Sequence, residues 1–197
     1  KENFLIVTNK RYKEQVLEHL PEISEEQILC EPIGRNTAPC IAYAAYTLKQ
    51  NNPDATMIVS PSDHLILNEE EFGRIVSNCA EYAEQNNALM TIGIEPSRPE
   101  TGYGYIAEGE AVGPDGKVRK VSSFREKPDL ETAKQYLKAG NYLWNAGIFV
   151  WSAQTIVRSI RTYAPDLAQK MDAMAPSFYT AAEAETESCR SFFFKGK

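Results

Sequence analysis

The stretch Thr56–Asn86, TMIVSPSDHLILNEEEFGRIVSNCAEYAEQN, predicts one complete strand-to-helix unit. Its first residues, Thr56–Ser60, form a short apolar run that is typical of a buried strand. A polar turn follows, and the Asn68 side chain is placed to cap a helix that continues to about Asn86. Glu69–Glu71 fill the first turn of that helix, where negative charge is favourable to the helix dipole. Such a unit indicates an α/β fold with a partly parallel sheet.

The same alternation continues on both sides of this unit. Toward the N-terminus we expect strands at Asn3–Thr8 and Gln27–Glu31 and helices at Arg11–Leu20 and Thr37–Gln50, the latter with the Thr37 hydroxyl as its cap. Toward the C-terminus we expect strands at Leu89–Ile94, Tyr103–Ala107, Val118–Phe124 and Gly147–Trp151, and helices at Asp129–Gly140 and Ser152–Tyr163. The GPDG turn predicts that the pair around it is antiparallel, and the residues after Pro165 are expected to be helical or irregular.

Composition and charge restrict the class of protein. Hydrophobic residues make up 43% and charged residues 24% of the 197 residues, as in an ordinary globular domain. The net charge of −6 argues against a nucleic-acid partner, and no apolar run is long enough for a membrane span. The four cysteines are widely spaced, which argues against structural zinc and favours a reducing, cytoplasmic setting.

The chain is expected to form a single, incomplete domain over residues 1–197. It does not begin with methionine, its first residues already enter a strand, and it stops in an apolar FFF run. We therefore expect a segment that is central and C-terminal within its domain.

Polar clusters at the carboxyl ends of predicted strands are candidate ligand contacts, because open α/β sheets bind their ligands there. The first is Glu31–Pro39, EPIGRNTAP, where a glycine loop before a helix offers backbone N–H groups to a phosphate or a polar ring. The second is Ser60–His64, in which Asp63 could hold Mg²⁺. Taken singly, either could be a plain capped turn.

Two further clusters suit a sugar phosphate. Glu100–Tyr105, ETGYGY, has two glycines that let a ligand approach the backbone, although they could serve turn geometry alone. In Arg125–Pro128, REKP, Glu126 could accept from sugar hydroxyls and Lys127 could neutralise a phosphate; a solvated charge run is the alternative. Asn145, before the GIFVW run, is a fifth candidate contact.

In this order, the blocks EPIGRNTAP, VSPSDH, ETGYGYI, FREKP and YLWNAGIF resemble the mannose-1-phosphate guanylyltransferases, within the sugar nucleotidyltransferases, over roughly Asn3–Tyr163. The similarity is strongest to the bacterial type. It implies a Rossmann-like nucleotidyltransferase (GT-A-like) α/β fold: a three-layer sandwich with a mixed, mostly parallel sheet, here without its N-terminal part.

The resemblance also implies roles for single residues. The residues near guanine would be Glu31, Gly34, Arg35, Asn36 and Thr37. Asp63 would coordinate Mg²⁺, and Lys127 would meet the sugar 1-phosphate, so both are the expected catalytic residues. The mannose ring would contact Gly102, Tyr103, Glu126 and Asn145.

The implied reaction forms GDP-mannose and pyrophosphate from GTP and mannose 1-phosphate, and the family allows a homodimer. The family's glycine-rich loop, which grips the triphosphate, does not occur in the sequence, and Ala146 stands where the family usually has serine. We therefore expect this segment to be inactive alone. The alternatives are a pyrophosphorylase for another sugar or base, such as a glucose-1-phosphate thymidylyltransferase, and a non-catalytic module that binds sugar nucleotides.

Overall fold

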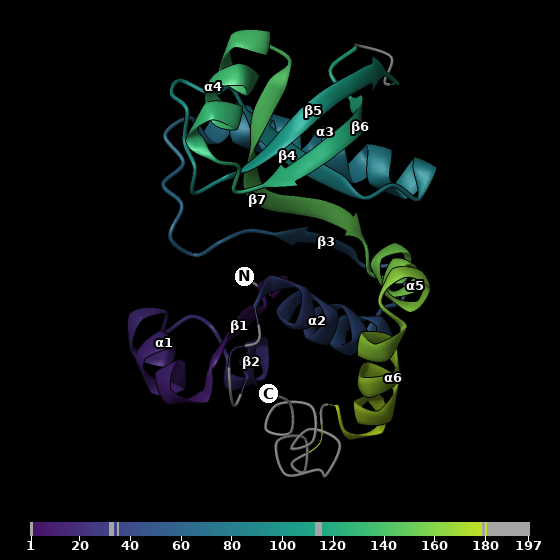
Figure 1. Ribbon diagram of the computed structural model, residues 1–197. Coiled ribbons are helices and arrows are strands. Elements are labelled where there is room, and N and C mark those ends of the chain that lie inside the picture. Colours follow the sequence, from purple (N-terminus) through teal and green to yellow (C-terminus); the bar gives the residue numbers. More distant parts are fainter. Residues whose placement is uncertain (1, 32–33, 35, 113–115, 179, 181–197) are drawn as a thin grey trace. The chain divides into compact units, whose positions relative to one another are not determined.

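The computed structural model describes residues 2–31, 34, 36–112, 116–178 and 180 (Figure 1). The chain divides into two compact units. Unit 1 comprises Lys1–Thr56 and Ser152–Lys197, and unit 2 comprises Met57–Trp151. The predicted helix AAEAETESCRSFFF and most of the GPDG turn lie outside the described residues.

Unit 1 combines a small parallel sheet with helices. Strands β1 (Ile6–Asn9) and β2 (Ile28–Glu31) pair in parallel, and α1 (Lys13–His19) connects them. The other helices are α2 (Thr37–Asn51), α5 (Ala153–Tyr163) and α6 (Pro165–Met174). Short 3₁₀ turns occur at Lys10–Tyr12, Glu25–Gln27 and Ala175–Ser177.

The core of unit 1 is built around α2. Seven consecutive residues of this helix, Ile41–Thr47, are buried, because α5 and α6 pack against it. A helix that is buried around most of its circumference requires an apolar sequence, which the IAYAAY run supplies. The ring of Tyr43 also lies 5.7 Å from the ring of Phe178, beyond the end of α6.

Unit 2 contains one sheet in the order β3-β7-β5-β6, with β4 paired to β7 (Figure 1). The strands are β3 (Thr56–Val59), β4 (Met90–Ile94), β5 (Gly104–Ala111), β6 (Arg119–Glu126) and β7 (Tyr142–Ser152). Helix α3 (Glu69–Asn86) passes behind the sheet in Figure 1, and α4 (Leu130–Ala139) supplies Ala133 to a core cluster with Tyr105 and Trp144.

Local helix signals are confirmed at three starts. The side chains of Asn68, Asp129 and Ser152 accept hydrogen bonds from backbone N–H groups three residues ahead, at 3.1, 2.9 and 3.1 Å. The prediction for Thr37 is wrong, because Thr37 is the first residue of α2 and the cap position belongs to Asn36, whose side chain makes no capping bond.

The strands differ from expectation in length and in direction. The antiparallel β5–β6 pair is confirmed, but β6 extends through Glu126, and β7 begins at Tyr142 instead of Gly147. Gly147, the predicted first residue of this strand, has a φ of +70° and marks an irregularity within it. The mixed sheet is confirmed. Among the four strand pairs whose register the described residues define, however, one is parallel and three are antiparallel, so the expected excess of parallel pairs is not found there.

Replacing Met171 by alanine is expected to destabilise the protein by about 2–5 kcal/mol, because a buried methionine leaves a cavity that neighbours fill only partly. Met171 lies in α6 and is fully buried. Urea denaturation followed by circular dichroism measures the change. Gln169→Ala, at an exposed position of the same helix, is the control and should change stability by less than about 0.5 kcal/mol.

Candidate functional site

In unit 1, the predicted base-binding residues lie where β2 leads into α2. Glu31 is the last residue of β2, and Thr37 is the first residue of α2. Asn36 stands between them with a φ of +71° and a ψ of −177°, a conformation that is strained for any residue except glycine. Gly34, Asn36 and Thr37 are exposed, whereas Arg35 lies outside the described residues. The exposed helix start offers backbone N–H groups to a polar ligand.

Glu31 is the unusual member of this group because it is a buried carboxylate. It is 7% exposed, and its Oε1 atom has no hydrogen-bond partner. Burial raises the pKa of Glu31 because it disfavours the charged form. Burial, assisted by the charge of Glu31, raises the pKa of the Cys40 thiol to about 11. A carboxyl group in such surroundings is suited to accept hydrogen bonds from a ligand that enters beside it.

The raised pKa of Glu31 predicts how stability depends on pH. The native state holds the Glu31 proton more tightly than the unfolded state, whose pKa is near 4.5. The contribution is therefore greatest below pH 4.5 and is lost as the pH rises through the folded-state pKa. We expect Glu31→Gln to be stabilising relative to the unaltered chain at pH 8 and less so at pH 4, measured by thermal denaturation. An identical pH dependence for both proteins would contradict this.

In unit 2, Asp63 lies in a turn that follows β3. The Asp63 side chain is exposed and makes no hydrogen bond or ion pair with any described residue. Pro61, in the same segment, approaches β7, since a Cβ added at Gly147 would lie 3.4 Å from the Pro61 Cγ. Because the Asp63 side chain is exposed and has no partner among the described residues, both of its oxygens are available for a cation. Mg²⁺ commonly takes one or two protein carboxylates and completes its shell with water and phosphate oxygens, so the residues present fit this ion.

The ETGYGY and REKP blocks meet in unit 2. Gly104 pairs with Glu126 across the β5–β6 ladder, and the Lys127 N–H donates to the Tyr103 carbonyl at 3.2 Å. A Cβ on residue 104 would lie 2.8 Å from the Glu126 carboxylate, so glycine at this position lets that side chain lie across the strand where it does. Lys127 has a φ of +45°, which is costly for a residue with a Cβ. Such strain is often found at functional sites.

Asn145 lies within β7, where its side-chain oxygen is already used. It accepts from the Thr91 hydroxyl at 2.9 Å and from the Gly147 N–H at 3.2 Å. These two bonds fix the orientation of the amide. The NH₂ group of Asn145 is the part left for donation to a ligand.

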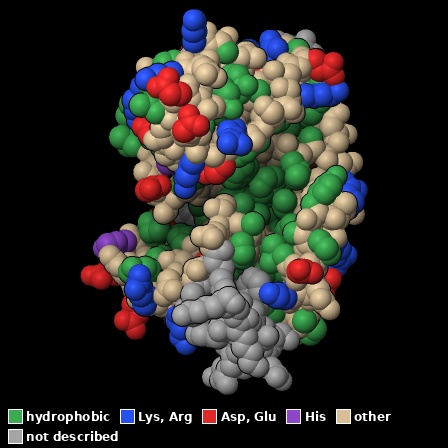
Figure 2. Space-filling model, in the orientation of Figure 1, with side chains coloured by type: hydrophobic (Ala, Val, Ile, Leu, Met, Phe, Trp, Pro, Cys, Tyr) green, Lys and Arg blue, Asp and Glu red, His purple; other side chains and the backbone are tan. Residues whose placement is uncertain are grey.

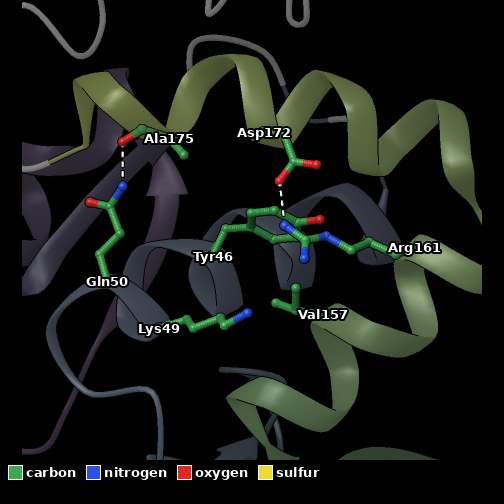
Figure 3. Close-up of a pocket in the computed structure, with 7 residues that line it drawn as sticks. All are labelled: Tyr46, Lys49, Gln50, Val157, Arg161, Asp172 and Ala175. Atoms are coloured by element: carbon green, nitrogen blue, oxygen red, sulfur yellow. Dashed lines mark hydrogen bonds and ion pairs between the residues drawn. The ribbon is translucent and has the colours of Figure 1, made fainter.

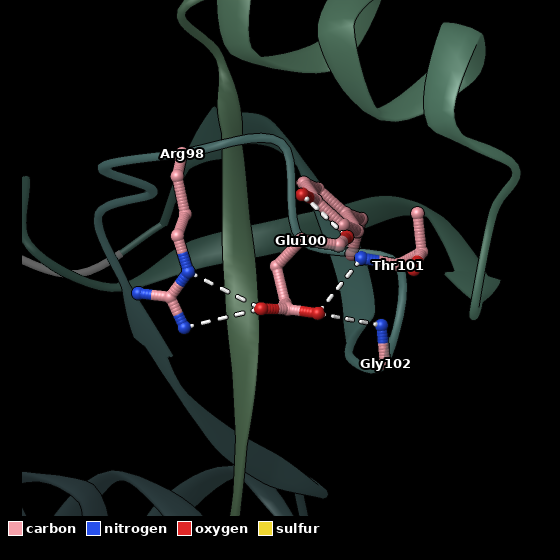
Figure 4. A network of polar contacts seen from close by, with 5 residues as sticks. Arg98, Glu100, Thr101 and Gly102 are labelled. Atoms are coloured by element: carbon pink, nitrogen blue, oxygen red, sulfur yellow. Dashed lines mark hydrogen bonds and ion pairs between the residues drawn. The ribbon is translucent and has the colours of Figure 1, made fainter.

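The structure gives a role to two side chains to which the sequence analysis assigned none: Arg98, and Glu100 at the start of the ETGYGY block (Figure 4). Glu100 Oε1 accepts from the N–H groups of Thr101 and Gly102, both at 3.0 Å. Its Oε2 accepts from Arg98 Nε and Nη2, at 3.2 and 3.1 Å. The Gly102 and Arg98 bonds are the main causes that lower the pKa of Glu100. The sequence feature that could have pointed to the Glu100 side chain was the presence of an acidic residue directly before the TGYG block.

A pocket in unit 1 contains none of the predicted site residues. It lies between α2, α5 and α6 and is lined by Tyr46, Lys49, Gln50, Val157, Arg161, Asp172 and Ala175 (Figure 3). Arg161 lies between the ring of Tyr46, 5.8 Å from its centroid, and Asp172, to which it donates at 2.7 Å. Gln50 donates to the Ala175 carbonyl. These contacts tie the three helices together.

On the face shown in Figure 2, basic and acidic side chains are interspersed over the described residues instead of gathering into one basic stripe. Within the described part of the chain, no helix has the length and apolar character needed to cross a membrane.

Comparison with known proteins decides the family. Residues 1–185 match the family described as Nucleotidyl transferase. The chain belongs to this family. The nucleotidyl transferase is 41% identical to the mannose-1-phosphate guanylyltransferase RfbM of Salmonella typhimurium over 167 residues and to the mannose-1-phosphate guanylyltransferase of Escherichia coli K12 over 172 residues. These matches cover 83% and 84% of this chain but 34% and 36% of the relatives, so the chain spans about a third of their length.

Solved structures confirm the α/β fold of this nucleotidyl transferase. A mannose-1-phosphate geranyltransferase from Thermus thermophilus superposes with a TM-score of 0.79 at 23% identity, over 96% of this chain and 54% of the other. A mannose-6-phosphate isomerase from Helicobacter pylori gives a TM-score of 0.75 at 29% identity, over 88% of this chain and 64% of the other. The expected nucleotidyltransferase fold class is thereby confirmed.

Proposed function

We propose that this nucleotidyl transferase chain contributes the base-binding and sugar-phosphate-binding residues of an enzyme that forms GDP-mannose and pyrophosphate from GTP and mannose 1-phosphate. The curated relatives named above are described as mannose-1-phosphate guanylyltransferases. We also propose a cytoplasmic location, which the thiols of Cys40 and Cys79, free of disulfides within the described part of the chain, support.

The observation that carries the proposal is the junction of Tyr103 and Lys127 in unit 2. One backbone hydrogen bond joins the two blocks there, and Gly104 leaves room for the Glu126 carboxylate beside them. An exposed carboxylate, an exposed ammonium group and a half-exposed aromatic ring are thus presented together. A carboxylate can accept from sugar hydroxyls, and an ammonium group is a phosphate ligand. Their combination is suited to a sugar phosphate.

The reaction would be a direct phosphoryl transfer. A phosphate oxygen of mannose 1-phosphate forms a bond to the α-phosphorus of GTP, and the bond from that phosphorus to the pyrophosphate oxygen breaks. Lys127 would hold the mannose 1-phosphate in line for attack, and Glu31 with the start of α2 would hold the base. Mg²⁺, held by Asp63, would neutralise charge on the phosphate oxygens. Catalysis of this kind depends on positioning and electrostatics and needs no covalent intermediate.

A chimeric enzyme tests the proposal, because the chain matches about a third of its relatives. This chain replaces the matching 172 residues of the E. coli guanylyltransferase. Pyrophosphate release is then measured with each of the four nucleoside triphosphates and with mannose 1-phosphate or glucose 1-phosphate. We expect release with GTP and mannose 1-phosphate. A folded chimera that is inactive with this pair, or that prefers dTTP and glucose 1-phosphate, contradicts the proposal.

A further inference from the structure

The Arg98–Glu100 cluster lies beside the proposed sugar-phosphate site but has no role in the proposal above. Glu100 is linked by two backbone N–H bonds to the turn that presents Tyr103. Tyr103 in turn accepts from the backbone of Lys127. The carboxylate of Glu100 thus binds the residue next to Tyr103, and Lys127 is connected to it through Tyr103.

The contacts close into a ring around this turn. The Arg98 guanidinium lies over the Trp144 ring, 5.3 Å from its centroid. The Trp144 ring meets the Tyr103 ring edge to face, with centroids 5.3 Å apart and planes at 80°. Arg98 returns to Glu100 through two hydrogen bonds, as Figure 4 shows. Each contact limits the freedom of the next, so the turn is held from both its backbone and its aromatic side.

The ring is also fixed to the interior of unit 2. The Tyr105 hydroxyl donates to the Glu100 carbonyl at 2.9 Å, and Tyr105 is fully buried. Trp144 is 8% exposed and belongs to the same core cluster. Glu100 is therefore held at its backbone by the core, while its side chain holds the exposed turn.

We propose that Glu100 is a positioning residue for the sugar-phosphate site, which orients Tyr103 and Lys127 by binding the N–H groups of Thr101 and Gly102. Arg98 is its partner and fixes the other carboxylate oxygen. The inference rests on the proposed function, because that function makes Tyr103 and Lys127 ligand contacts. Charge-assisted bonds of a carboxylate to backbone N–H groups are stronger than neutral ones, which suits an acidic residue to this task.

The test compares two ligands that differ by the sugar. The affinities of the 197-residue chain for GDP-mannose and for GDP are measured by calorimetry. We expect Glu100→Ala to weaken GDP-mannose binding by about tenfold or more, since the turn loses its two charge-assisted bonds to the carboxylate, and to leave GDP binding unchanged. Glu100→Gln keeps an acceptor oxygen for both N–H groups and should recover most of the affinity. Glu110→Ala, which removes the exposed ion pair with Lys120 farther along β5, is the control and should change neither affinity.

The outcomes separate this inference from the function on which it rests. If the unaltered chain binds GDP-mannose no more tightly than GDP, the proposed sugar site is wrong and the inference fails with it. If it does discriminate and Glu100→Ala keeps the full difference, the positioning role alone is wrong. Equal losses for both ligands together with a lower melting temperature also overturn that role, because they indicate a general structural effect.

Discussion

Lys127→Ala is expected to raise the KM for mannose 1-phosphate in the chimeric enzyme by about 10- to 150-fold. A hydrogen bond to a charged group contributes about 1.5–3 kcal/mol, and each 1.4 kcal/mol corresponds to a factor of about ten. The KM for GTP should stay the same, because the proposed contact is to the sugar phosphate. Initial rates at varied concentrations of each substrate measure both constants.

Three further variants separate the charge of Lys127 from its backbone conformation. Lys127→Gly removes the cation but relieves the cost of the positive φ, so a residue needed only for the turn would be replaced without loss. We expect Lys127→Gly to be as impaired as Lys127→Ala, and Lys127→Arg to recover part of the affinity. Lys138→Ala, at an exposed position of α4, is the matched control. Normal kinetics for Lys127→Gly would exclude the phosphate contact.

Asp63→Asn is expected to lower kcat in the chimeric enzyme on the order of 1000-fold, because a bound metal supplies several kcal/mol of charge stabilisation in the transition state. The amide removes the negative charge with little change in shape. Since the Asp63 side chain has no hydrogen-bond partner among the described residues, the fold should be unaffected.

A metal titration distinguishes this role from a structural one. The Mg²⁺ concentration that gives half-maximal rate should rise strongly in Asp63→Asn, and circular dichroism should match that of the unaltered protein. Asp54→Asn, at an exposed turn position before β3, is the control and should leave the Mg²⁺ dependence unchanged. An unaltered Mg²⁺ dependence in Asp63→Asn would rule out the metal role.

The resemblance identified the family. The residues of unit 2 show which parts of the candidate site could be predicted from the sequence. Tyr103, Glu126 and Lys127 were placed in one site because their blocks resembled those of a family, and the structure brings them together through β5 and β6. Glu100 lay within the ETGYGY block, but the sequence analysis assigned its side chain no role. Its role depends on Arg98 and Trp144, and a contact with Trp144, more than 40 residues away, cannot be read from local spacing.

By itself, the sequence determined the features that arise within a few residues. The caps at Asn68, Asp129 and Ser152 are hydrogen bonds to N–H groups three residues ahead, so spacing alone predicts them. Only the tertiary structure decided that Glu31 is buried and that β7 continues through Asn145. Burial and strand length depend on what packs or pairs from distant parts of the chain, and a local pattern contains no information about those partners.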